Sequence, residues 1–164
     1  MRHTLMHPTL GEIVYEENFW TGKKAICVGG KSLYKLNKTT YALGTGDEKK
    51  VFTLSGNSYF GASLTVDGET IQIVPKSKWY ELALSALIVA FNIVWGNSVV
   101  LCSIIPIVGG GIGGAISAGM AMVALLKMKE TDEIWKKVLI ALGFFLASLL
   151  ACFVLGIAFL SVLY

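Results

Sequence analysis

The sequence predicts an all-β N-terminal domain, a small antiparallel sandwich or barrel of about seven strands, followed by an α-helical membrane domain of three spans. Two observations predict this division. Residues 82–126 and residues 138–164 contain no charged side chain, and uncharged, mostly apolar stretches of 18 or more residues are typical of helices that cross a bilayer. Residues 1–78, in contrast, carry 10 of the 14 basic and 7 of the 11 acidic side chains, which favours a water-soluble domain.

Residues 11–75 are expected to form the β-domain, after a flexible leader of residues 1–10. Short runs rich in β-branched and aromatic residues alternate with Gly, Asn and Asp, which is the pattern of short strands and tight turns. Two turns are specific, because Asp67-Gly68 and Gly29-Gly30 suit type I′ hairpins, in which both central residues need a positive φ. The expected strands are residues 12–16, 24–28, 32–36, 40–43, 51–54, 62–66 and 70–74.

Three segments carry a resemblance to a known family. They are Gly22-Lys23-Lys24, Val28-Gly29-Gly30-Lys31 and Leu64-Thr65-Val66-Asp67-Gly68-Glu69. Their order over residues 19–74 resembles the strand-and-hairpin rhythm of the Fas apoptotic inhibitory molecule family, although Gly29 stands where that family usually has Asp or Asn. The resemblance implies a cytosolic β-sandwich that acts as a binding or scaffolding module, and it supplies no catalytic residue.

The first uncharged run is too long for one span. As a straight helix, its 45 residues would extend about 68 Å, roughly twice the thickness of a bilayer core. Breaks at 95–98 and 106–111 divide it, so residues 97–109 are expected to be a short interfacial or re-entrant segment. The transmembrane domain then covers residues 79–164, with spans at about 79–95, 110–128 and 135–162.

The lysines that flank these spans predict the topology. They are Lys76, Lys78, Lys127, Lys129, Lys136 and Lys137. All six precede the first span, end the second or begin the third, so they share one side of the membrane. The positive-inside rule places that side in the cytoplasm. We therefore expect a cytosolic β-domain, a C-terminus outside the cell, and a location in the plasma membrane.

Small residues predict where the helices pack. In lipid, helices associate through close backbone approach and interhelical hydrogen bonds. Asn92 is the amide within the first span and is expected to bond across helices. The packing is either between the second and third spans of one chain or between copies in an oligomer, which could enclose a pathway. The small residues are Gly109, Gly110, Gly113, Gly114, Gly119, Gly143, Ala147 and Gly156.

Several classes of site are disfavoured. Residues 109–114 contain G-x-G-x-x-G, but a dinucleotide site needs a preceding strand and a soluble βαβ unit, so no cofactor is expected. His3 and His7 lie in the expected leader, where an exposed terminus is favoured over a metal site. No nucleophile–base pair or paired carboxylates can be assigned, so no catalytic residue is predicted. The net charge of +3 is dispersed, which disfavours nucleic acid as a partner.

The sequence favours a non-enzymatic, multi-pass membrane protein whose cytosolic β-domain is a binding, adaptor or sensor module. Its expected partners are the lipid bilayer, a cytosolic protein and further copies of the chain. One alternative is a small oligomeric transport or pore component packed through the glycine-rich span. Another is an immunity-type protein that protects against a membrane-active toxin, which only the small size and the architecture favour.

Overall fold

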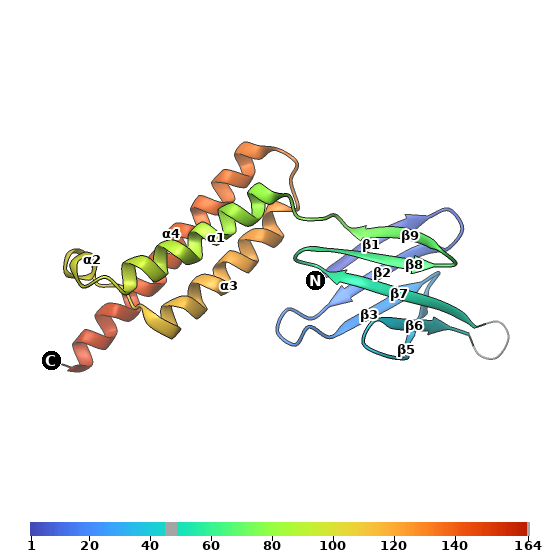
Figure 1. Cartoon of the computed structure of the whole chain (residues 1–164), viewed down its shortest axis with the longest axis horizontal. Helices are drawn as coiled ribbons and strands as arrows, with labels where there is room; N and C mark the ends of the chain where they lie inside the picture. Colours follow the sequence, from blue (N-terminus) through green and yellow to red (C-terminus); the bar gives the residue numbers. More distant parts are fainter. Residues whose placement is uncertain (45–48, 164) are drawn as a thin grey trace. The chain divides into compact units, whose positions relative to one another are not determined.

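The computed structural model describes residues 1–44 and 49–163, which belong to two compact units, Met1–Lys76 and Ser77–Tyr164 (Figure 1). The first unit consists of β-strands and the second of helices. The predicted fold class, an all-β domain followed by a helical membrane domain, is therefore confirmed.

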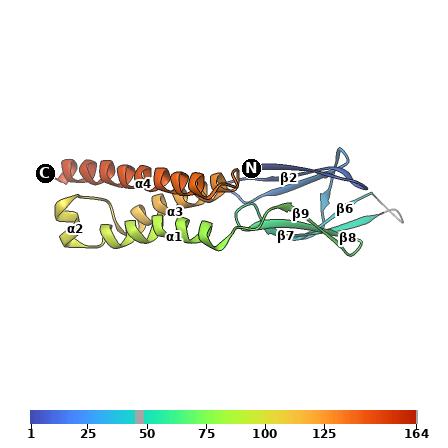
Figure 2. The same ribbon diagram turned by 90° about the horizontal axis from the view of Figure 1, so that it is seen from above.

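The first unit is a sandwich of two antiparallel sheets, which form separate layers in Figure 2. Within the described residues one sheet has four strands in the order β1-β2-β3-β4, and the other has five in the order β5-β6-β7-β8-β9. The strands are β1 (Arg2–His7), β2 (Gly11–Glu17), β3 (Lys24–Val28), β4 (Lys31–Ser32), β5 (Tyr34–Lys35), β6 (Thr40–Leu43), β7 (Lys50–Asn57), β8 (Gly61–Val66) and β9 (Glu69–Val74).

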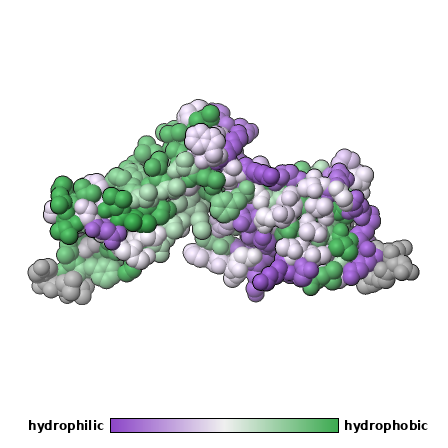
Figure 3. Space-filling model, viewed as in Figure 1, coloured by the Kyte–Doolittle hydropathy of each residue, from purple (hydrophilic) through white to green (hydrophobic). Residues whose placement is uncertain are grey.

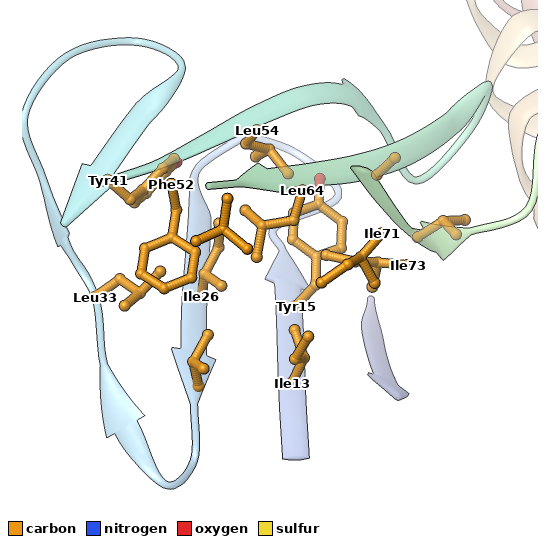
Figure 4. Close-up of a cluster of buried hydrophobic side chains, with 14 residues drawn as sticks. Ile13, Tyr15, Ile26, Leu33, Tyr41, Phe52, Leu54, Leu64, Ile71 and Ile73 are labelled. Carbon is orange, nitrogen blue, oxygen red and sulfur yellow. The ribbon is translucent and has the colours of Figure 1, made fainter. Parts of the chain in front are cut away.

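The core of this unit lies between the two sheets (Figure 4). Side chains alternate between the faces of a strand, so every second residue points inward. Ile13 and Tyr15 of β2 meet Phe52 of β7 and Leu64 of β8, and all four are fully buried. Alternating apolar residues thus give each sheet one apolar face, and the two sheets bury these faces against each other.

The two predicted hairpin turns have the expected backbone. Asp67 and Gly68 have φ values of 49° and 81°, and Gly29 and Gly30 have values of 56° and 76°. Positive φ at both central positions matches the right-handed twist of the flanking strands, which is why these dipeptides set the register of β8–β9 and β3–β4.

The N-terminal segment corrects a sequence-based expectation. Residues 2–7 are not a flexible leader but strand β1, paired along its length with β2, with Thr4 opposite Val14. Leu5 packs against the core, and His3 and Leu5 are less exposed than their neighbours Arg2 and Thr4. The polar composition and Pro8 obscured this alternation.

A second correction concerns the expected strand at residues 32–36. The chain forms two short strands there, β4 and β5, which belong to different sheets. Leu33 lies between them and is buried in the core. The strand is divided because the chain crosses from one sheet to the other at this residue.

The second unit contains three long helices and one short one: α1 (Trp79–Gly96), α2 (Val99–Ile104), α3 (Gly110–Met128) and α4 (Ile134–Leu163). The three long helices are long and apolar enough to cross a membrane, and hydrophobic residues dominate the visible face of this unit in Figure 3. The chain is therefore a membrane protein by the length and composition of these helices. Residues 97–109, between the first two spans, contain α2 and an extended segment.

Candidate functional site

Polar side chains gather in the interior of the helical unit, at the end where α1 and α4 begin. Glu81 lies in the first turn of α1 and Lys137 in the first turn of α4. The Lys137 Nζ lies 2.5 Å from the Glu81 Oε1, and only 2% and 3% of the two side chains are exposed. Such a pair is stable only where hydrogen bonds compensate for the lost hydration of both ions.

Glu81 also completes the start of its own helix. Its Oε2 accepts a hydrogen bond of 3.0 Å from the backbone N–H of Lys78, the residue that precedes α1. A carboxylate in the first turn of a helix is favoured by the positive end of the helix dipole. The Glu81 carboxylate therefore caps the start of α1 with one oxygen and binds Lys137 of α4 with the other.

This ion pair was not expected from the sequence. The sequence singled out Lys137 only as one of six lysines that flank the spans, and it gave no role to Glu81. The missed signal is spacing, because Glu81, Ser85, Ile88 and Asn92 follow one another at intervals of three and four residues. They share one helix face, and all four are buried.

Asn92 connects the same face of α1 to α4. Its Nδ2 donates to the backbone carbonyl of Ile88 at 2.8 Å and to the Ser148 Oγ of α4 at 3.2 Å. Within the described residues, the Asn92 Oδ1 and the Ser85 Oγ have no hydrogen-bond partner. A row of polar side chains thus runs along the buried face of α1, and side chains of α4 provide some of its hydrogen-bond partners.

The connection between α2 and α3 packs into the helical unit through glycines. A Cβ on Gly109 would collide with the backbone of Gly96 at the end of α1, and a Cβ on Gly113 would collide with the carbonyl of Val108. A Cβ on Gly156 of α4 would lie 2.6 Å from the carbonyl oxygen of Pro106. Close backbone approach is therefore required at three places, and it covers the extended segment on several sides.

One hydrogen bond joins this segment to the middle of α4. The backbone N–H of Val108 donates to the carbonyl of Cys152 at 3.0 Å. Gly156 lies one turn beyond Cys152, and because it has no side chain the backbone of Pro106 and Ile107 can approach α4 there. Non-helical backbone is tolerated at membrane depth only where protein or water satisfies its polar groups. This contact supplies one such partner.

The other small residues singled out in the sequence have different surroundings. A Cβ added at Gly110, Gly114, Gly119 or Gly143 would meet no atom within 4 Å, and Ala147 is exposed. The structure therefore brings Gly109, Gly113 and Gly156 into the contacts around residues 105–109. At the remaining glycines the described chain leaves room for a side chain, and Gly114 and Gly119 are half-buried.

Two of these small residues line a surface groove on α4. Gly143 and Ala147 line it together with Ile140 and Phe144, and its charged lining residues are Lys127 of α3, Glu130 and Lys136 of α4. The groove encloses about 570 Å³. The two lysines that line the groove form ion pairs, Lys127 with Glu130 and Lys136 with Glu133. Neighbouring carboxylates therefore compensate the charge of both lysines.

The start of α1, the end of α3 and the start of α4 lie together at one end of the second unit (Figure 1), and the flanking lysines belong to these helix ends. Lys78 precedes α1, Lys127 and Lys129 end α3, and Lys136 and Lys137 begin α4. Of these five, Lys137 is buried. Lys76 ends the first unit, two residues before Lys78.

The β unit has a buried carboxylate of its own. Glu17 follows Ile13 and Tyr15 at inward positions of β2 and is 5% exposed. Its Oε2 accepts hydrogen bonds of 2.7 Å from the Tyr15 hydroxyl and from the Ser58 backbone N–H. Burial alone would raise the pKa of Glu17, but these hydrogen bonds and the nearby Lys24 favour the carboxylate more, so the pKa lies below its usual value.

No group of three metal-ligating side chains is found in residues 1–44 and 49–163. His3 and His7, four residues apart, lie on β1, where the His7 Nε2 is 3.5 Å from a Glu69 carboxylate oxygen. No protein-family model, no curated protein and no solved structure matches this chain. The resemblance of residues 19–74 to the Fas apoptotic inhibitory molecule family therefore stays a prediction.

Proposed function

We propose that this chain is a non-enzymatic, multi-pass membrane protein whose β-domain binds a cytosolic protein, as an adaptor or sensor, while its three helices fix it in the plasma membrane. The observation that carries the proposal is an apolar patch on the outer face of the second sheet. Tyr34, Leu36 and Val51 are 41%, 45% and 45% exposed. Tyr34 of β5 and Val51 of β7 both lie opposite Ala42 of β6.

The place of this patch in the sandwich favours a soluble partner. Val51 lies near the start of β7, whereas the chain leaves the β unit at the opposite end, after Val74, which pairs with Ala62. Exposed apolar side chains that cluster on one face are typical of protein interaction sites. Val51 of the patch thus lies at the end of its sheet opposite to the attachment to the first span.

The interior of the helical unit supports an anchoring role for the spans. Its ionic and amide groups mostly bond one another, Glu81 with Lys137 and Asn92 with Ser148. Groups used in this way hold helices together. The lysines at one end of this unit favour a cytoplasmic position for that end, and therefore for the β-domain.

The experiment places a photo-crosslinking amino acid at Leu36 or Val51 of the full chain in native membranes. A control carries it at Leu150, which is 63% exposed on α4. We expect a discrete protein adduct from Leu36 and Val51 and none from Leu150. If irradiation yields no protein adduct from either β-domain position, the proposed binding module is wrong.

A second candidate is an oligomeric transport or pore component. It is favoured by the uncovered small residues Gly110, Gly114 and Gly119 of α3, where a second copy could approach closely. Cysteine crosslinking at Ala115, which is exposed on α3, distinguishes the two. Covalent dimers in native membranes would favour the oligomer, and a strictly monomeric protein would exclude it.

A further inference from the structure

Two loops of the β unit have the same pattern of hydrogen bonds from an asparagine side chain, and they lie side by side. The β2–β3 loop begins at Asn18, whose Oδ1 accepts hydrogen bonds from the N–H groups of Trp20 and Thr21 at 3.0 and 2.9 Å. The β7–β8 loop begins at Asn57, whose Oδ1 accepts from the two residues at the same offsets, Tyr59 and Phe60. Each asparagine holds a tight turn that presents aromatic residues at its tip.

Contacts between the loops hold their relative position. The rings of Phe19 and Tyr59 lie 6.2 Å apart in an edge-to-face arrangement. The Lys24 Nζ donates to the Gly56 carbonyl at 2.6 Å. Together with the hydrogen bond from the Ser58 N–H to the Glu17 carboxylate, these contacts make the two tips one surface.

The tips expose large aromatic side chains. Trp20 is 88% exposed and Phe60 is 59% exposed. The described turns at the opposite end of the sandwich, residues 8–10, 29–30 and 67–68, contain no Phe, Tyr or Trp. Among these turns, exposed aromatic residues therefore occur at one end of the sandwich, and they are grouped there rather than scattered. The other exposed aromatic side chain described in this unit, Tyr34, lies on strand β5.

That end is the one at which the chain leaves the β unit. The start of β8 pairs with the end of β9, Ala62 with Val74, and a Cβ on Gly61 would lie 2.8 Å from the Cα of Lys76. Lys76 is three residues before Trp79, where the first span begins. Three extended residues reach at most about 10 Å, so the chain itself keeps this end close to the membrane.

We propose that the two loop tips insert Trp20 and Phe60 into the headgroup region of the bilayer that α1 crosses. Tryptophan and phenylalanine are favoured at such interfaces. The exposed side chains of Lys23 and Lys76 add attraction to anionic headgroups. This insertion holds the two tips at the lipid surface. It depends on the three spans and not on the protein partner proposed above.

The test measures the lipid contact of Trp20 in the full chain. Trp79, Trp95 and Trp135 are replaced by Phe, so that Trp20 is the only tryptophan, and the protein is placed in nanodiscs of phosphatidylcholine and phosphatidylglycerol. We expect lipids brominated near the glycerol to quench its emission at least about twofold, and aqueous iodide to quench it weakly, as for a residue at the interface.

The matched control carries its only tryptophan at the other end of the sandwich. It combines Met6→Trp with Trp20→Phe on the same background, because Met6 is 74% exposed and pairs with Glu12 near the β1–β2 turn. We expect iodide to quench this position and brominated lipid to leave it unchanged. If Trp20 behaves like the control, or if brominated lipid quenches both positions equally, the proposed insertion is overturned; in the first case the tips are free for a protein partner.

Discussion

Glu81 and Lys137 are 56 residues apart in the chain, yet their side chains form a buried ion pair between the first turns of α1 and α4. Glu81 also accepts the N–H of Lys78. The pair therefore joins the start of the first span to the start of the third.

Replacing Lys137 by Met should destabilise the helical unit by about 3–5 kcal/mol, because a buried carboxylate would lose its counter-ion. The double variant Glu81→Gln and Lys137→Met should lose much less than the sum of the single losses. Steric trapping in bicelles measures these free energies of unfolding. Lys136→Met is the control, since that lysine is 45% exposed and pairs at the surface with Glu133, and it should cost less than about 1 kcal/mol.

Alanine at Gly109 or Gly156 should destabilise the helical unit by about 1–3 kcal/mol, because the added methyl group would overlap backbone atoms of residues 96 and 106. Gly119→Ala is the control and should cost nothing measurable, since its Cβ would meet no atom within 4 Å. The same unfolding assay ranks the three variants. Equal losses at all three positions would contradict the close approach described around residues 105–109.

The β-domain should lose stability in acid through Glu17. Because the folded pKa of Glu17 is lowered, the carboxylate stabilises the fold above its unfolded pKa of about 4.3, and this stabilisation disappears as the pH falls through the folded value. Melting temperatures from far-ultraviolet circular dichroism should fall below about pH 4. Glu17→Gln should flatten this dependence, whereas Glu16→Gln, at an exposed neighbouring position, should retain it.

Asn97 and Asp132 should react with impermeant reagents from opposite sides of the membrane. In a background with Cys27→Ser, Cys102→Ala and Cys152→Ala, a thiol introduced by Asn97→Cys should be labelled from outside intact cells. A thiol introduced by Asp132→Cys should be labelled only after the cells are opened, because the lysines around it favour the cytoplasm. Labelling of both thiols from the same side would exclude the proposed topology.

Features specified by neighbouring residues could be predicted from the sequence. Strands at 24–28 and 40–43 and the helix at 110–128 have the expected bounds, since alternation, turn dipeptides and uncharged length are local signals. The β1 strand was missed because His3 and His7 occupy its less exposed positions. Leu33 was placed within one strand, although the crossing between sheets depends on how the whole sandwich closes.

The candidate site was less predictable because its contacts join distant segments. Asn92 was expected to bond across helices, but nothing local identified Ser148 as its partner. Gly96 was interpreted only as a break between spans, whereas its backbone faces Gly109. Lys137 resembles its neighbour Lys136 in sequence, and only the position of Glu81 on another helix distinguishes a buried ammonium group from a solvated one.

The double role of Glu81 has a consequence for biogenesis. When only α1 and α3 have left the ribosome, its carboxylate accepts a hydrogen bond from the Lys78 N–H but lacks its ion-pair partner, since Lys137 is not yet synthesised. The first two spans are therefore incompletely stabilised in the membrane until α4 has been synthesised. Chains stopped after Glu133 should be degraded faster than full-length chains in a pulse-chase experiment, and Glu81→Gln should remove most of that difference.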